Sequence, residues 1–87
     1  MARILNIVYF AWVKERLGKG QEAMELSSDL DTISDLVELL CRQAPEYTDV
    51  FADLTKLRFA LDQEFTSIDA SIKNAEELAI FPPVTGG

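Results

Sequence analysis

The sequence predicts an α+β fold, in which one main helix packs on one face of a mixed sheet of about five strands. Three observations lead to this fold class. The chain has 87 residues, of which 48% are hydrophobic and 26% charged, and this is the composition of a single globular domain. One segment carries apolar residues at helical spacing. Several short segments on either side of it alternate between apolar and polar residues, as strands do.

The first predicted strand covers residues 3–11. Leu5, Ile7 and Tyr9 share one face of this strand, and we expect that face to line the core. Phe10 falls on the opposite face. The strand therefore presents one aromatic residue away from the core.

A loop is predicted over residues 12–20, because the segment contains two glycines and four charged residues. Trp12 is expected to anchor this loop rather than to contact a partner. Residues 21–26 then pair back on the first strand as the second arm of a hairpin.

The main helix is predicted to begin after Thr32. Residues 32–35 have the pattern of a capping box, with an acidic residue near the positive end of the helix. Pro45 ends the helix. Cys41 is expected to be a small buried hydrophobe rather than a reactive thiol. The apolar stripe consists of Ile33, Leu36, Val37, Leu40, Cys41 and Ala44.

The second half of the chain predicts three more strands. Leu78 and Ile80 are the inward residues of the last strand. The expected elements are a connection over residues 46–55 with at most one helical turn, a strand over 57–62, a turn over 62–64, a short strand over 65–68, a polar loop over 69–76, and a last strand that Pro82 and Pro83 end.

The order of these elements suggests how the sheet is assembled. The first and last strands can lie side by side and parallel at its centre, with the helix in the connection between them, as the right-handed crossover rule permits. This arrangement is the β-grasp, or ubiquitin-like, roll. We expect residues 1–83 to form the β-grasp domain and residues 84–87 an extended C-terminal tail.

The charge of the chain restricts its partners. There are 8 Lys and Arg against 15 Asp and Glu, a net charge of −7, which disfavours nucleic acid and anionic membrane surfaces. No apolar run approaches the ~20 residues of a membrane span, and the first residues lack the layout of a signal peptide. We therefore expect a cytoplasmic protein.

The residue types also limit the chemistry. With no histidine and one cysteine, the chain has no Cys/His metal cluster, no Ser-His-Asp triad and no internal disulfide. We expect no metal site. The chain is not expected to be an enzyme on its own.

The last residues of the sequence are the most informative. Pro82 and Pro83 favour a stiff, extended stem. Gly86 and Gly87 have no side chains, so a terminal carboxyl could enter a narrow slot in another protein. We interpret this carboxyl as the working group of the molecule. A frayed tail, which most termini are, is the alternative that the residues leave open.

Segments at both ends of the chain resemble one known family. Residues 8–11 read Val-Tyr-Phe-Ala, residues 14–18 read Lys-Glu-Arg-Leu-Gly, and residues 81–87 read Phe-Pro-Pro-Val-Thr-Gly-Gly. These motifs, with the helix between them, resemble the small subunits of molybdopterin synthase over the whole chain. The terminal motif is the most specific of the three.

The resemblance implies a sulfur carrier in molybdenum cofactor biosynthesis. In that family the Gly87 carboxylate would be adenylated by a ubiquitin-activating-type enzyme that uses ATP, and a sulfur donor would then convert it to a thiocarboxylate. The tail would enter the large subunit, which binds cyclic pyranopterin monophosphate, in a heterotetramer of two small and two large subunits. The chain itself would bind no cofactor.

An apolar docking surface is also expected. Phe10 and Phe81 lie on the strand faces away from the helix, and Phe65 can join them, which matches the partner-facing patch of the family. Ordinary partial burial is the alternative for each ring. The predicted partner-binding residues are Phe10, Phe65, Phe81, Pro82, Pro83, Val84 and Thr85.

Two other functions share the fold and the Gly-Gly end. One is the sulfur carrier of the thiazole pathway, which the Phe-Pro-Pro stem disfavours. The other is a protein modifier of ubiquitin type, for which the same terminus could form isopeptide bonds. The sequence separates the synthase subunit from both only through the resemblance.

Overall fold

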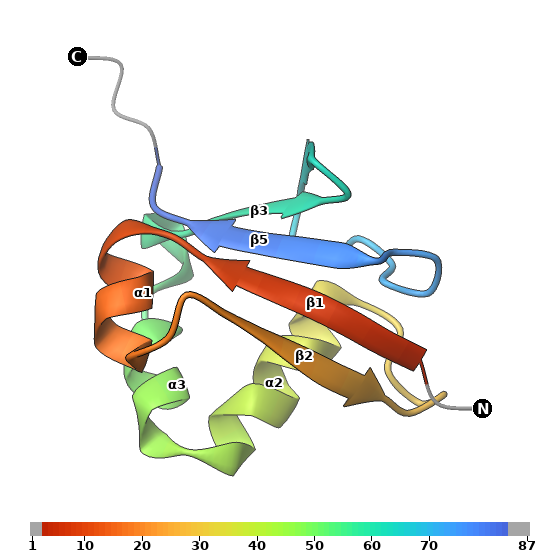
Figure 1. The fold of residues 1–87 in the computed structure, drawn as a ribbon, viewed down its shortest axis with the longest axis horizontal. Coiled ribbons are helices and arrows are strands. Elements are labelled where there is room, and N and C mark those ends of the chain that lie inside the picture. Colours follow the sequence, from red (N-terminus) through yellow and green to blue (C-terminus); the bar gives the residue numbers. More distant parts are fainter. Residues whose placement is uncertain (1–2, 84–87) are drawn as a thin grey trace.

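The computed structural model describes residues 3–83. Five strands form one sheet in the order β2-β1-β5-β3-β4, and the helices gather on one side of it (Figure 1). The predicted α+β, β-grasp fold is therefore confirmed. The elements are β1 (Arg3–Tyr9), α1 (Ala11–Leu17), β2 (Gln21–Leu26), α2 (Ile33–Gln43), α3 (Pro45–Val50), the 3-10 helix η1 (Leu54–Lys56), β3 (Arg58–Leu61), β4 (Glu64–Thr66) and β5 (Glu77–Phe81).

The centre of the sheet is a parallel pair, as predicted. β1 and β5 run side by side with Ile7 opposite Leu78 and Tyr9 opposite Ile80. β2 joins the other edge of β1 as an antiparallel hairpin arm, and β3 joins the other edge of β5 in antiparallel orientation. Both central strands therefore finish at the same end of the sheet.

The core lies between the sheet and α2. Leu5, Ile7, Leu78 and Ile80 are fully buried on the sheet side, as their alternation predicted. The buried residues of α2 are Ile33, Leu36, Val37 and Leu40. Each large side chain taken out of water contributes about 1.5–3 kcal/mol, so this layer supplies most of the cohesion.

Cys41 lies at the margin of that layer. The thiol was expected to be buried, but the residue is only half-buried and packs against the core from its edge. Eight residues along an α-helix bring Cys41 about 80° around the axis from Ile33, toward the side of the stripe.

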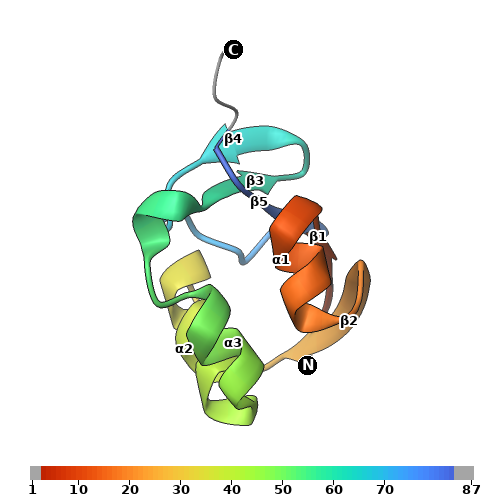
Figure 2. The ribbon, with the colours of Figure 1, turned by 90° about the vertical axis from the view of Figure 1, so that its left-hand side faces the viewer.

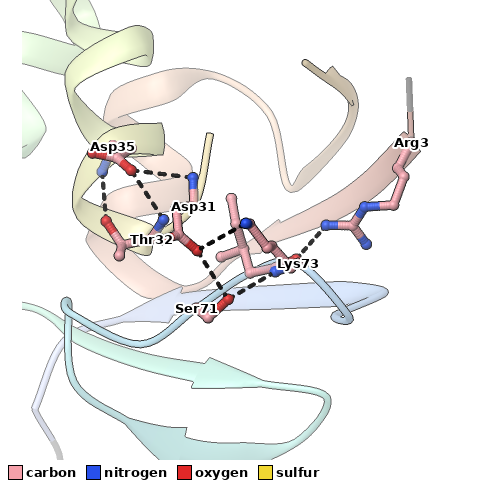
Figure 3. Close-up of polar contacts among 7 residues, drawn as sticks. Arg3, Asp31, Thr32, Asp35, Ser71 and Lys73 are labelled. Atoms are coloured by element: carbon pink, nitrogen blue, oxygen red, sulfur yellow. Dashed lines mark hydrogen bonds and ion pairs between the residues drawn. The ribbon is translucent and has the colours of Figure 1, made fainter. Parts of the chain in front are cut away.

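The predicted start of α2 is confirmed in detail (Figure 3). The Thr32 hydroxyl accepts a hydrogen bond from the Asp35 N–H at 3.1 Å, and the Asp35 carboxylate accepts from the Thr32 N–H at 3.1 Å. The same carboxylate accepts from the Asp31 N–H at 3.1 Å. These backbone hydrogen bonds hold the pKa of Asp35 below its usual value.

The loop over residues 69–76 is held against this end of the molecule. Ser71 donates to the Asp31 carboxylate (Figure 3). The Arg3 guanidinium donates to the carbonyls of Ile72 and Ala75. Ile72 and Ala75 are buried, so the segment predicted as polar also carries part of the core.

The prediction of a loop over residues 12–20 was wrong, and so was the end of the first strand. β1 ends at Tyr9, and residues 11–17 form α1, because Val13 and Leu17 lie one turn apart and are both buried. Gly18 ends α1 in the left-handed region, at φ 75°, where its N–H bonds the Lys14 carbonyl. The glycine taken as a loop signal is a helix cap.

The connection after α2 is also more ordered than expected. Pro45 ends α2 and at the same time begins α3. Proline is tolerated at this position because the N–H of the first helical residue makes no hydrogen bond within the helix. Tyr47 and Val50 of α3 are buried, and Asp53 caps η1. β4 covers only residues 64–66, after a turn in which Asp62 and Gln63 have positive φ. Within residues 3–83 there is no helix long and apolar enough to cross a membrane.

Candidate functional site

The predicted stem, Pro82 and Pro83, begins where the central strand β5 ends. Phe81 is the last residue of β5, and Pro82 and Pro83 follow it half-buried. Figure 1 shows this point beside the end of β1, at the end of the sheet where α1 lies. The remaining predicted site residues, Val84, Thr85, Gly86 and Gly87, lie outside the described residues.

Three phenylalanines surround this point, and we call them the tail-root patch: Phe10, Phe65 and Phe81. The rings of Phe65 and Phe81 touch, with centroids 5.6 Å apart and planes inclined at 42°. Phe65 is 83% exposed and Phe10 is 49% exposed. The Phe10 N–H donates to the Ile80 carbonyl at 3.2 Å, which holds Phe10 next to Phe81.

The sheet register explains why the patch faces away from the core. Phe65 lies opposite Ala60, and Ala60 lies opposite Ala79 of β5, so these residues share the outer face. Phe81 is two residues beyond Ala79 and lies on the same face. Exposed, adjacent aromatic rings are typical anchors of protein interfaces, so the patch is suited to docking another protein.

The backbone after Phe10 is strained. Phe10 is extended, with φ −124° and ψ 154°, and Ala11 then has φ 55°. A left-handed conformation costs a residue with a Cβ atom about 1–2 kcal/mol. This turn directs the chain from β1 into α1 and leaves the Phe10 ring on the outer face.

A polar cluster lies under the same end of the sheet, and we call it the Glu22 network: Tyr9, Lys19, Glu22 and Tyr47. One Glu22 oxygen accepts hydrogen bonds from the Tyr9 hydroxyl at 2.5 Å and from the Tyr47 hydroxyl at 2.6 Å. The Lys19 ammonium donates to the other Glu22 oxygen at 3.3 Å and to the Tyr47 hydroxyl at 2.9 Å. The network joins β1, β2, α3 and the connection after α1.

The hydrogen bonds decide the charge state of this cluster. Burial alone would raise the pKa of the Glu22 carboxyl, but the hydrogen bonds from Tyr47, Tyr9 and Lys19 outweigh burial and lower that pKa. Burial and the adjacent carboxylate raise the pKa of both phenols. The hydrogen bond to Tyr47 raises the pKa of Lys19. At neutral pH the network is therefore an ion pair with two phenol donors.

Sequence reasoning missed this network. Tyr9 was placed on the core face, where it is indeed buried, but its hydroxyl partner was not foreseen. Glu22 comes from a weakly patterned strand and Tyr47 from a segment expected to hold at most one helical turn, so no local signal joins them.

Trp12 lies in α1 rather than in a loop. It is half-buried, and the Arg16 guanidinium lies 5.7 Å from the centre of its ring. Arg16 also pairs with Asp49 of α3 at 2.6 Å. Figure 2 shows α1 and α3 side by side at this end of the molecule. Between them is an open pocket of about 390 Å³, lined by Trp12, Arg16, Asp49, Val50, Ala52, Asp53 and Lys56.

Among the described residues there is no group of three or more His, Cys, Asp and Glu that could hold a metal ion. The geometry provides exposed aromatic rings around the end of β5, where Pro82 and Pro83 follow.

Comparison with known proteins places the chain among sulfur carriers. It is 32% identical over 84 residues to the molybdopterin synthase sulfur carrier subunit of Haemophilus influenzae, covering 97% of this chain and 100% of the relative. The subunit of the same name from Dictyostelium discoideum is 35% identical over 89 residues, covering all of both chains. These relatives support a sulfur carrier role.

Solved structures agree with the fold. SAMP1 from Haloferax volcanii superposes with a TM-score of 0.76 at 21% identity, covering 98% of this chain and 100% of that one. The small archaeal modifier protein 1 from Methanosarcina acetivorans superposes with a TM-score of 0.71 at 17% identity, covering 100% and 99%. At the level of family models, residues 7–87 match the ThiS family. The chain therefore belongs to the ThiS family.

Proposed function

We propose that this chain is the sulfur carrier subunit of a molybdopterin synthase, with the carboxyl group of Gly87 as the group that carries sulfur. The observation that supports this most is similarity along the whole length to sulfur carrier subunits, in a family match that extends to Gly87. The curated relatives do not favour a thiazole-pathway carrier or a protein modifier.

The proposed chemistry takes place on the terminal carboxyl. A carboxylate is a poor electrophile, so the Gly87 carboxylate first attacks the α-phosphorus of ATP in an adenylating enzyme of ubiquitin-activating type. Pyrophosphate leaves, and an acyl adenylate forms. A sulfur donor at the sulfide oxidation level, in the simplest case hydrosulfide, then attacks the acyl carbon and displaces AMP, and loss of the S–H proton leaves a thiocarboxylate. ATP belongs to the activating enzyme, and this chain binds no cofactor of its own.

The loaded carrier then delivers its sulfur. The tail-root patch docks on the large subunit, and residues 82–87 reach into the active site that binds cyclic pyranopterin monophosphate. A dithiolene needs two sulfur atoms, so two carriers are consumed per cofactor, in an assembly of two small and two large subunits. Since the carrier has a net charge of −7, the large subunit supplies the basic groups that hold the phosphate.

Intact mass spectrometry tests the proposal. The chain is incubated with the activating enzyme, ATP and a sulfur donor, and the expected product has one oxygen replaced by sulfur at Gly87. A chain lacking Gly87 is the control and should stay unmodified. If the full chain keeps its original mass while a known carrier is converted, the proposed function is wrong. Conjugates on lysines of other proteins would instead indicate a modifier.

A further inference from the structure

The Glu22 network closes around α1. Tyr9 comes two residues before Ala11, the first residue of α1, whereas Lys19 and Glu22 come two and five residues after Leu17, the last one. One carboxylate therefore bonds to the chain on both sides of the helix, at Tyr9 and Lys19. The bond from Tyr47 adds a support from α3.

α1 depends on such supports. It has seven residues, fewer than the ~12–15 that make an isolated helix stable in water. Its first turn receives no side-chain cap, and it begins at the strained Ala11. A left-handed residue with a Cβ atom persists only where its surroundings hold it in place.

The position of the network links it to the tail-root patch. Tyr9 is the residue before Phe10, and the two side chains lie on opposite faces of the sheet, one bonded to Glu22 and the other exposed. The Tyr9 N–H donates to the Gly20 carbonyl at 2.8 Å, so the backbone at this junction is bonded to β1's neighbours on both sides. The bond from the Tyr9 hydroxyl to Glu22 adds a side-chain tie to these backbone bonds, so its loss should loosen the junction that presents Phe10.

We propose that the Glu22 network is the positioning device of the tail-root patch, holding the β1–α1 junction so that Phe10 stays exposed beside Phe81 for docking. This inference rests on the proposed function, because it assumes that the patch binds the synthase large subunit. Fixing a docking residue before contact reduces the ordering cost of association. A half-buried carboxylate is a poor source of stability compared with apolar packing, which favours a positioning role for this one.

Three titratable groups face Glu22, and they decide which substitutions test its role. Tyr9 faces it from β1, Tyr47 from α3 and Lys19 from the connection after α1. The ion pair that joins α1 directly to α3, Arg16 with Asp49, is exposed on both sides and is screened by water. Glu22 is therefore the group whose substitution should affect the junction most.

The first experiment needs no partner. Glu22→Gln keeps the size of the side chain but removes its charge, and Asp35→Asn makes the same change in the capping box of α2. Amide hydrogen exchange is measured along the chain, with the fluorescence of Trp12, the single tryptophan, as a second probe of α1. Glu22→Gln should speed exchange in α1 about tenfold relative to α2, the ratio expected for a lost charge-assisted hydrogen bond.

Asp35→Asn should show the reverse pattern, with faster exchange at the start of α2 and no change in α1. Tyr47→Phe, which leaves Glu22 bonded to Tyr9 and Lys19, should give a smaller effect in the same direction as Glu22→Gln. It guards against a Glu22 variant that fails to fold. If Tyr47→Phe and Glu22→Gln leave α1 as protected as in the wild type, or speed all amides equally, the inference is wrong.

The second experiment measures binding by calorimetry to the synthase large subunit of the same organism. Wild type and Asp35→Asn should bind equally, whereas Glu22→Gln should bind about fivefold more weakly, as expected for disordering one interface side chain. Wild-type affinity retained in Glu22→Gln would overturn the inference and leave the proposed function standing. Absence of wild-type binding would overturn the proposed function, and the docking role with it.

Discussion

Two carboxylates at opposite ends of the molecule do different work. Asp35 bonds to backbone N–H groups three and four residues away and fixes the start of α2. Glu22 bonds to the hydroxyls of Tyr9 and Tyr47, which are 13 and 25 residues away in the sequence, and joins a strand to a helix. The comparison shows that similar carboxylates can define one element locally or hold several elements together.

The two sites also differ in how much of the fold their hydrogen bonds require. The Asp35 bonds form within one turn of chain, so they can begin to form before the rest of the fold does. The Glu22 bonds require β1, β2 and α3 to be in place. Glu22 therefore reports on the tertiary structure near the tail, whereas Asp35 reports on a single helix end.

The largest expected effect comes from a substitution in the core, which supports both carboxylate sites. Leu36 is fully buried in the core between α2 and the sheet. Leu36→Ala should lower the free energy of unfolding by about 2–5 kcal/mol, because it leaves a cavity. Urea denaturation measures this loss. Hydrogen exchange should rise throughout the chain, and a rise confined to α2 would show that the two ends unfold separately.

A second substitution separates docking from folding. Phe81→Arg places a charge in the tail-root patch, where the ring contacts Phe65 and is only half-buried. Affinity for the large subunit should fall by about 2–4 kcal/mol, because an aromatic anchor is lost. Calorimetry measures the affinity, with circular dichroism as the check that the fold is retained. Unchanged affinity would mean that the partner binds elsewhere.

A pH titration sharpens the comparison at the tail end. Hydrogen bonds lower the pKa of Glu22 in the folded protein. The contribution of Glu22 to the free energy of unfolding is therefore present above its unfolded pKa of about 4.3 and is lost as the pH falls through the folded pKa. Near neutral pH, Glu22→Gln should cost about 1–3 kcal/mol. In urea denaturation, the difference in the free energy of unfolding between Glu22→Gln and wild type should disappear below about pH 4. A gap that stays constant with pH would exclude the carboxylate as its source.

The smallest expected effect concerns the turn before α1. Ala11→Gly should raise the free energy of unfolding by about 0.5 kcal/mol, because glycine tolerates the φ of 55° and this gain exceeds the added freedom of the unfolded chain. Urea denaturation at neutral pH is precise enough if the variant is measured beside wild type. A loss of stability would show that Ala11 is not strained.

The parts of the fold that repeat a short pattern could be predicted from the sequence. Alternation placed Leu5, Ile7 and Tyr9 on one face and Phe10 on the other, and Thr32 with Asp35 marked the start of α2. These features depend on residues a few positions apart. The outward position of the Phe10 ring follows from the same alternation.

The rest depends on contacts between distant segments. α1 is too short to show a helical period, and its Gly18 cap resembles any loop glycine. α3 was reduced to a single turn because Pro45 was used only as the end of α2. The Glu22 network combines residues from three elements, so it could be recognised only once those elements were placed in space.

The central position of β5 has a mechanical consequence. β5 is hydrogen-bonded to β1 on one side and to β3 on the other, and the stem leaves directly from its end. A force applied along the stem would load both ladders in shear, so many hydrogen bonds would have to break together before the strand slipped. The domain should therefore resist unfolding when force is applied through the stem.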